Sequence, residues 1–439
     1  MTEWLVGTVV PVALLLCGAY FAVVLVRHLR YRPCRRRGSS SSARALAVAL
    51  AGTLGVGNIA GVASAITLGG AGAVFWMWVA ALLAMPLKYA EIVLALRHRT
   101  READGTSHGG AMYYIKEAFG GKAGRGAAAL FAVLCALCAL TLGGMLQSNA
   151  AAEALSVTLR LPPAMVGGGM AALALLVLAG GGKRIERVCT ALVPFMCLLF
   201  AVAALAVLIL RRDALPAAFG AIFRGALTPR AGAGGAFGVL ASGALRYGVS
   251  RGLVSNEAGC GTAPIAHAAA EVEYPAEQGL WGILEVFVDT ILLCTLTALV
   301  ILTSGVPLEA GEGVSLAPAA FRAVLGDVAE PLLAVSVAFF AFATVLCWSH
   351  YGVESLGYLL GQRRAKRLLL PAMAAAVLSG ALFAPALVWD ATDLVLGLMT
   401  LLNLAALLLL RDGVRAETRF FSGREEANLQ NVNRIDKRS

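Results

Sequence analysis

The chain has 439 residues, of which 59% are hydrophobic and 14% are charged, and its formal net charge is +10. Soluble domains carry about 25% charged residues, so the composition excludes a soluble globular protein and indicates a polytopic membrane protein. The basic residues lie mainly between apolar segments, which argues against a nucleic-acid partner and for an orientation signal in a lipid bilayer.

The first apolar segment, residues 4–26, has the length of a full membrane span and lacks a basic region before it, so it is not read as a cleaved signal peptide. The arginines that follow it from Arg27 to Arg37 predict an outside N-terminus and, after an odd number of spans, a cytoplasmic C-terminus. A long loop is expected at 211–230 and a solvated, partly disordered basic tail at 411–439. The eleven predicted spans are 4–26, 44–68, 72–96, 126–157, 164–181, 187–210, 238–268, 279–304, 331–358, 367–387 and 390–410.

Polar and glycine residues interrupt the second span. Thr53, Gly55, Gly57, Asn58 and Gly61 lie in its middle, where glycine disfavours a continuous helix. Opened backbone is tolerated at membrane depth only where it lines a cavity or is buried in protein. A broken helix is therefore predicted at 51–61.

The seventh span carries a matching interruption at 250–261, where Ser255, Asn256 and Glu257 are flanked by glycines. Two interrupted spans at corresponding positions of two halves indicate an inverted-repeat transporter. The predicted organisation is a peripheral N-terminal transmembrane helix at 1–33, a core at 44–410 and the tail at 411–439. The repeats within this core would be 44–211 and 238–410.

The motifs GVGNIAGVASAI, GGAMYYI, GVSRGLVSNEAGCGTAPIAHAAA, VFVDT and CWSHYG resemble those of the alanine or glycine:cation symporters. The resemblance extends from about residue 44 to residue 410. It implies an all-α, leucine-transporter-like fold of five plus five inverted spans with one extra N-terminal helix. It also implies inward movement of a small neutral amino acid coupled to sodium, in a prokaryotic inner membrane, without an organic cofactor.

An amino-acid zwitterion needs donors for its carboxylate and acceptors for its ammonium group. In the implied fold, the amides around Val56 and Gly57 serve the carboxylate, and half-helix dipoles reinforce them. Carbonyls near Thr53 and at 253–256 serve the ammonium group. Other residues predicted around the substrate are Asn58, Gln147, Ser255, Asn256 and Trp348, each of which could instead have only a helix-packing role.

Sodium ligands are predicted at two places: Asn58 with the Thr53 carbonyl, and Thr344 with the carbonyls of Leu54 and Ala51. Val56 and Ala343 replace hydroxyl residues that are usual in the family, so a proton could replace sodium as the driving ion. Glu285 and Asp289, at i and i+4 in the eighth span, are the candidate proton carriers. Alternatively, Glu285 lies near the cytoplasmic end of its span and reaches water.

Two further patterns are interpreted as structural. Lys88 and Glu91, at i and i+3, are expected to pair with each other at a cytoplasmic helix end, and Cys135 and Cys138 to be small buried helix residues. An enzyme is not expected, because the chain has no HExxH motif and GVGNIAG lacks the dinucleotide-binding spacing. A channel and a non-transporting amino-acid sensor stay open as alternatives, as do the choice among alanine, glycine, D-alanine and serine, and the oligomeric state.

Overall fold

A computed structural model describes residues 5–29, 40–102, 106–227, 243–308, 316–383 and 386–436. These residues are almost entirely helical, and the two short strands among them pair in antiparallel fashion, with Thr100 opposite His108. The helices of the first half are η1 (Leu5–Val9), α2 (Val10–His28), α3 (Ser40–Thr53), η2 (Val56–Asn58), α4 (Ala60–Gly69), α5 (Gly72–Arg97), α6 (Ala111–Phe119), α7 (Gly121–Cys138), η3 (Ala139–Leu146), α8 (Gln147–Leu159), α9 (Pro163–Leu178), α10 (Gly182–Leu210), η4 (Arg212–Ala214) and α11 (Leu215–Leu227); the strands are β1 (Thr100–Arg101) and β2 (Ser107–His108).

The described part of the second half is again almost entirely helical. Its elements are α13 (Gly243–Asn256), α14 (Ala263–His267), α15 (Pro275–Val286), η5 (Phe287–Cys294), α16 (Thr295–Thr303), α17 (Leu316–Leu325), η7 (Gly326–Val328), α18 (Ala329–Leu360), α19 (Gln362–Leu382), α20 (Ala386–Leu409) and α21 (Arg411–Asp436). Gly361, with a φ of +80°, ends α18 and lets α19 begin at the next residue.

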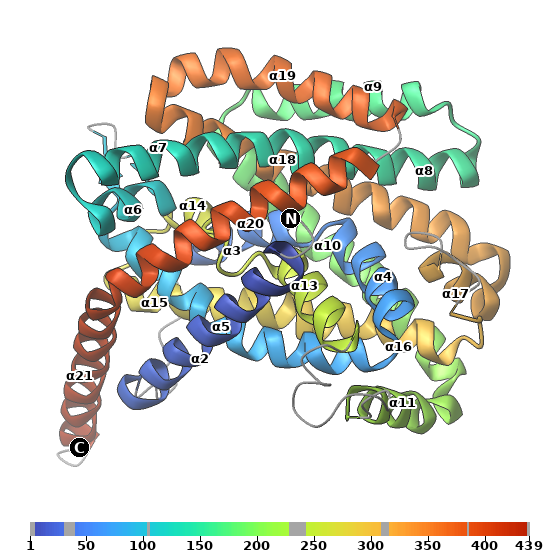
Figure 1. The fold of residues 1–439 in the computed structure, drawn as a ribbon, viewed down its shortest axis with the longest axis horizontal. Coiled ribbons are helices and arrows are strands. Elements are labelled where there is room, and N and C mark those ends of the chain that lie inside the picture. The colour runs from blue at the N-terminus through green and yellow to red at the C-terminus, as the bar shows by residue number, and fades with distance from the viewer. Residues whose placement is uncertain are drawn as a thin grey trace.

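The helices form two layers with the interrupted helices between them (Figure 1). Helices α7, α8, α9, α18 and α19 make one layer, and α2, α5, α15 and α16 lie across the other, while α3, α4, α13 and α14 run between the layers. The buried side chains of both layers join in one hydrophobic core. The polar breaks of α3–α4 and α13–α14 are thereby placed in the middle of the molecule.

Glycines allow neighbouring helices to approach closely. A Cβ atom added to Gly248 of α13 would lie 2.3 Å from the Ala73 carbonyl oxygen of α5. On the opposite layer, a Cβ atom at Gly380 of α19 would lie 2.3 Å from the carbonyl oxygen of Met145 in η3. Small residues that bring backbones together are typical of helix packing in membranes.

Eight helices in the described part of the chain are long and apolar enough to cross a membrane, or nine when the bent pair α3 and η2–α4 is counted as one span. The prediction of eleven spans is therefore not matched by this criterion. The two remaining predicted segments do form helices, but α9 has only 16 residues and α13 only 14, and α13 carries polar residues throughout.

The predicted loop at 211–230 is wrong for most of its length, because α11 occupies Leu215–Leu227. Its segment LPAAFGAIFRGAL is too short to span a bilayer but has an apolar face. Phe219 and Phe223 on this helix pack against Trp78, and Phe223 also packs against Phe75. The helix thus covers α5 from outside.

The predicted disordered tail is also wrong for its described part, which forms α21. Val414, Thr418 and Phe421 are buried at i, i+4 and i+7, so one face of α21 docks on the rest of the molecule. The Thr418 hydroxyl lies 3.0 Å from that of Tyr89, and Ser422 donates a hydrogen bond to the carbonyl of His28. The tail therefore connects α5 to the end of α2.

Candidate substrate and ion site

The first predicted break is confirmed. Helix α3 ends at Thr53, the chain turns through η2, and α4 leaves at an angle of 65° to α3. The Gly55 amide donates hydrogen bonds to the Thr53 carbonyl at 2.9 Å and to Asn58 Oδ1 at 3.1 Å, which fixes the opened turn. Gly55 has no side chain, so Thr344 and Gln147 can approach the backbone closely at this point.

The second break is also confirmed, at the C-terminal end of the predicted interval. Helix α13 ends at Asn256, whose side chain accepts a hydrogen bond from the Ala258 amide, and α14 begins at Ala263. Glu257 adopts a φ of +52°, a conformation rare for a residue with a side chain. Such strained positions cluster at functional sites.

A small cavity of about 20 Å³ lies between the two breaks, and α8, η3 and α18 close it from the opposite layer. A volume of this size holds about one water molecule, so an amino acid can enter only if the walls separate. The lining residues are Gly52, Thr53, Gly55, Val56, Gly57, Leu142, Leu146, Gln147, Val254, Glu257, Thr344, Trp348 and Trp389.

Five of the predicted substrate residues line this cavity: Thr53, Val56, Gly57, Gln147 and Trp348. The side-chain oxygen of Gln147 accepts a hydrogen bond of 3.3 Å from the Val56 amide, so α8 contacts the opened backbone directly. No acceptor for the Gly57 amide is found in the part of the chain that the structure describes. That amide is therefore available to a ligand.

Glu257 was not predicted as a site residue, yet it is the one ionisable side chain among the described residues of the cavity wall. Its Oε1 accepts a hydrogen bond of 3.1 Å from Trp348 Nε1, and its Oε2 accepts one of 2.7 Å from the Thr262 hydroxyl. The side chain is 2% exposed. A glutamate within an apolar span is itself a signal for function, and Glu257 carries this signal in the sequence.

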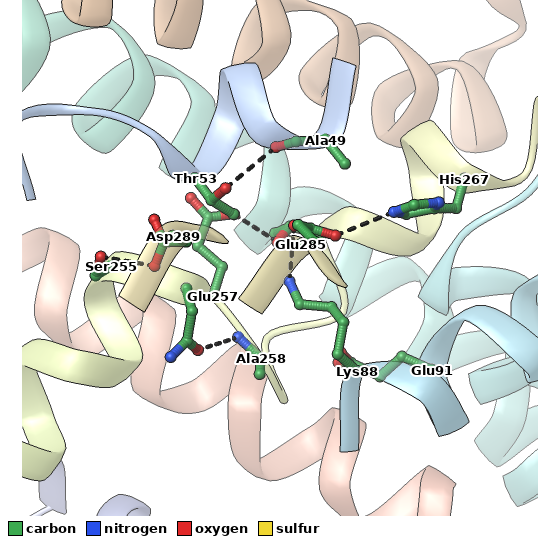
Figure 2. Close-up of polar contacts among 12 residues, drawn as sticks. Ala49, Thr53, Lys88, Glu91, Ser255, Glu257, Ala258, His267, Glu285 and Asp289 are labelled. Carbon is green, nitrogen blue, oxygen red and sulfur yellow. Dashed lines mark hydrogen bonds and ion pairs between the residues drawn. The ribbon is translucent and has the colours of Figure 1, made fainter. Parts of the chain in front are cut away.

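The other three predicted substrate residues, Asn58, Ser255 and Asn256, do not line the cavity. They lie in a buried cluster around Asp289, and Figure 2 shows Ser255 beside Asp289. Asn58 donates to Asp289 Oδ1 at 2.7 Å, and Ser255 donates to Asp289 Oδ2 at 2.9 Å. Thr290 also donates to Oδ2 and receives a hydrogen bond from Asn256. One carboxylate thus joins the two breaks.

The predicted sodium ligands are likewise divided, because Thr344 lines the cavity and Asn58 belongs to the cluster around Asp289. The Thr344 hydroxyl lies 3.4 Å from the Leu54 carbonyl oxygen, so these two oxygens are close together, as expected. Asn58 instead turns its amide nitrogen to Asp289, and its side-chain oxygen accepts from Gly55. Val56 lines the cavity and Ala343 is fully buried, so neither supplies a side-chain oxygen.

The expectation that Glu285 reaches water is wrong, because its side chain is fully buried. Lys88 is equally buried and pairs with Glu285 at 3.3 Å rather than with Glu91, which corrects the predicted Lys88–Glu91 pair. Glu91 instead accepts hydrogen bonds from the Gly261 amide and from Asn403. Helix α15 packs directly on α5, so a partner on a neighbouring helix replaces the local one. Cys135 and Cys138 are free and buried, as expected.

The model of the Sodium:alanine symporter family matches residues 1–435. The chain belongs to this family. The sodium/alanine symporter AgcS of Methanococcus maripaludis is 39% identical over 390 residues, which cover 88% of this chain and 85% of that protein. The putative sodium/proton-dependent alanine carrier protein YrbD of Bacillus subtilis is 34% identical, with 91% and 87% of the two chains covered.

A manganese transporter from Eremococcus coleocola has a similar fold, with a TM-score of 0.54 at 16% identity over 87% of this chain and 80% of that one. The all-α membrane-transporter fold predicted from the sequence is thereby confirmed, whereas the leucine-transporter-like layout of five plus five inverted spans stays a prediction. As a member of the sodium:alanine symporter family, this membrane protein is a cation-coupled amino-acid transporter.

Replacing Gly55 with alanine is expected to abolish uptake while leaving a folded protein. The new Cβ atom would lie 3.0 Å from Thr344 Oγ1 and 3.1 Å from Gln147 Oε1, so both side chains must leave their contacts with the break. Gly61→Ala is the matched control, because nothing lies within 4 Å of a Cβ atom there. Uptake in proteoliposomes measures the effect, and equal activity of the two variants would contradict this account of the break.

Proposed function

We propose that this protein imports a small neutral amino acid, alanine or glycine, together with sodium by alternating access. The observation that carries the proposal is the cavity between two broken helices, which has a carboxylate, a free backbone amide and a side-chain amide in its wall. These groups match the two ends of a zwitterion. Leu142, Leu146, Val254 and Trp348 leave space for only a small side chain.

In this proposal the substrate carboxylate contacts the Gly57 amide and the side-chain nitrogen of Gln147. A helix N-terminus favours an anion, and η2 and α4 both begin near this point. The ammonium group contacts Glu257, whose two oxygens each accept one hydrogen bond from the described residues. Buried charges are costly unless they are paired, so an ammonium group offsets the cost of burying this carboxylate.

Sodium would bind beside the first break, where the Leu54 carbonyl and the Thr344 hydroxyl already lie close together. A second position at Asn58 and the Thr53 carbonyl is less favoured, since Asn58 Oδ1 already accepts the Gly55 amide. The runner-up function is proton-coupled transport of the same amino acids, with Asp289 and Glu285 as the carriers. Their complete burial and their position beside the breaks support that alternative.

The membrane orientation and the repeat organisation follow from the sequence. We place the protein in a prokaryotic plasma membrane with its N-terminus outside and its C-terminus in the cytoplasm, because Arg27–Arg37 directly follow the first span. The core at 44–410 would consist of the repeats 44–211 and 238–410, each opening with a broken helix. The N-terminal helix α2 packs outside this core.

The test is alanine uptake into proteoliposomes under a sodium gradient alone, a proton gradient alone, both, or neither. The expected result is accumulation driven by sodium alone and abolished when an ionophore dissipates the sodium gradient. Accumulation driven only by protons would favour the runner-up. Equilibration without accumulation would indicate a channel, and binding without uptake would indicate a sensor; either result would contradict the proposal. Unlabelled glycine, serine and D-alanine serve as competitors.

A further inference from the structure

A second group of buried polar residues lies beyond the second break and does not line the amino-acid cavity. Lys88 of α5, His267 of α14, and Gln278 and Glu285 of α15 are all fully buried. In Figure 2, Lys88 reaches Glu285 from one side and the ring of His267 points at it from another. The proposed sodium and substrate contacts involve none of these four residues.

The four residues form a continuous chain of hydrogen bonds and an ion pair. The side-chain nitrogen of Gln278 lies 2.7 Å from His267 Nδ1, His267 Nε2 lies 3.0 Å from Glu285 Oε2, and Lys88 Nζ lies 3.3 Å from Glu285 Oε1. A glutamine nitrogen can only donate, so in this arrangement Nδ1 accepts and the ring is the neutral tautomer with its proton on Nε2. Donation from Nε2 to Glu285 then completes the chain.

Gln278 can serve the charged ring equally well. Its Oε1 atom is buried and has no hydrogen-bond partner among the described residues. If the amide turns by 180°, Oε1 takes the place of the nitrogen and accepts a hydrogen bond from a protonated Nδ1. The two arrangements have the same shape and the same number of hydrogen bonds to His267. The neutral and the protonated imidazole are therefore both accommodated without repacking.

The surrounding charges favour proton uptake. From α5, Lys88 and Glu91 face the cluster, and from the second break Glu257 and the Cys260 thiol do so. From helix α18, the phenol of Tyr351 and the thiol of Cys347 also face the cluster. On α3, the charge of Arg44 is paired with Glu186. Lys88 and Glu285 form an ion pair, and the carboxyl groups of Glu91, Glu257 and Asp289 lie nearby. A positive charge on His267 would lie beside the Glu285 carboxylate rather than alone in the apolar interior, and a paired buried charge is less costly than an unpaired one.

We propose that His267 is a proton-binding site, separate from the amino-acid cavity, where Nδ1 takes up one proton as the Gln278 amide turns over. Helix α14 directly continues the second break, and the Glu91 carboxylate beside Lys88 holds the Gly261 amide of that break. Proton occupancy is therefore coupled to the position of the break. This coupling to transport rests on the proposed function, whereas the proton site itself does not.

The decisive experiment is NMR of the full-length protein in detergent micelles with ¹³C-labelled histidine, of which the chain has five. The ring signal that is missing in His267→Gln is assigned to His267 and followed through the pH range in which imidazoles titrate. Gln278→Glu is expected to raise the midpoint by about one pH unit or more, because an opposite charge stabilises the imidazolium. Gln278→Met removes the acceptor and is expected to lower it.

Gln362→Met is the matched control, because Gln362 contacts the ring of His108 instead. Should a Gln278 variant fail to fold, Glu285→Gln must still lower the midpoint of His267. A His267 signal that does not titrate, or midpoints that move in the same direction in the two Gln278 variants, would overturn the proposal. The pH dependence of sodium-driven uptake, measured separately, should shift in each variant in the same direction as the His267 midpoint. If the wild-type protein shows no sodium-driven uptake, the proposed function is contradicted. The proton site is then still decided by the NMR titration alone.

Discussion

Replacing Asp289 with asparagine is expected to destabilise the protein and to stop transport. The carboxylate accepts hydrogen bonds from Asn58 of the first break, Ser255 of the second, and Thr290. An amide offers one acceptor oxygen, so its NH₂ group must meet the amide of Asn58 or the two hydroxyl groups. Hydrogen bonds to a charged group contribute about 1.5–3 kcal/mol each, and breaking such a buried cluster costs about 3–5 kcal/mol.

Thermal unfolding of the purified variant in detergent measures this loss, and a fall in Tm of roughly 10 °C is expected. Asp327→Asn is the matched control, because the Asp327 side chain is 92% exposed and forms its ion pair with the exposed Arg322. The control should unfold within about one degree of the wild type, as surface changes usually do. If the Asp289→Asn variant unfolds at the same temperature as the control, the hydrogen bonds of Asp289 to the two breaks contribute no measurable stability.

Replacing Glu257 with glutamine is expected to weaken alanine binding by about 30-fold or more. Glutamine keeps the shape and can still accept from Trp348 and donate to Thr262, so the main change is the loss of the negative charge. Truncating one partner of a buried, hydrogen-bonded charge pair costs about 2–5 kcal/mol. The substrate ammonium is the proposed second partner. Alanine binding by calorimetry at saturating sodium checks the effect directly.

Glu153→Gln provides the comparison, since Glu153 is exposed on α8, the same helix that carries Gln147. It should bind alanine like the wild type. A Glu257→Gln protein with unchanged affinity but poor stability would place Glu257 in the scaffold and move the ammonium group to backbone carbonyls. The carboxylate would then be explained by its hydrogen bonds to Trp348 and Thr262 alone.

The parts of the fold that the sequence predicts are those with a local cause. Glycines beside asparagine predict both breaks, because such residues disfavour a continuous helix wherever they stand in the chain. Gln147 could be placed at the site because it is a polar residue at membrane depth, and Trp348 because its bulky side chain can limit the space for a substrate side chain. The helical nature of each long apolar segment likewise follows from composition alone.

The parts that could not be predicted depend on contacts between distant segments. Lys88 and Glu91 look like a local pair, yet 197 residues separate Lys88 from its actual partner Glu285. The polar sequence of the tail gives no sign that Tyr89 and His28 present a surface for α21. Asn58 could equally turn its oxygen or its nitrogen toward a neighbour. Only the folded arrangement, with Asp289 beside it, decides which group it presents.

The glycine contacts between helices have a mechanical consequence. Two backbones touch where Gly248 of α13 packs on α5 and where Gly380 of α19 packs on η3. At such a contact neither helix can slide past the other without a clash. We therefore expect α4, α5 and α13 to rotate as one rigid body, and η3, α8, α18 and α19 as another. Thr53, Gly57 and Glu257 are carried by the breaks, next to the first body, while Gln147 and Trp348 belong to the second. A bound amino acid would then contact both rigid bodies, so its affinity would depend on the angle between them.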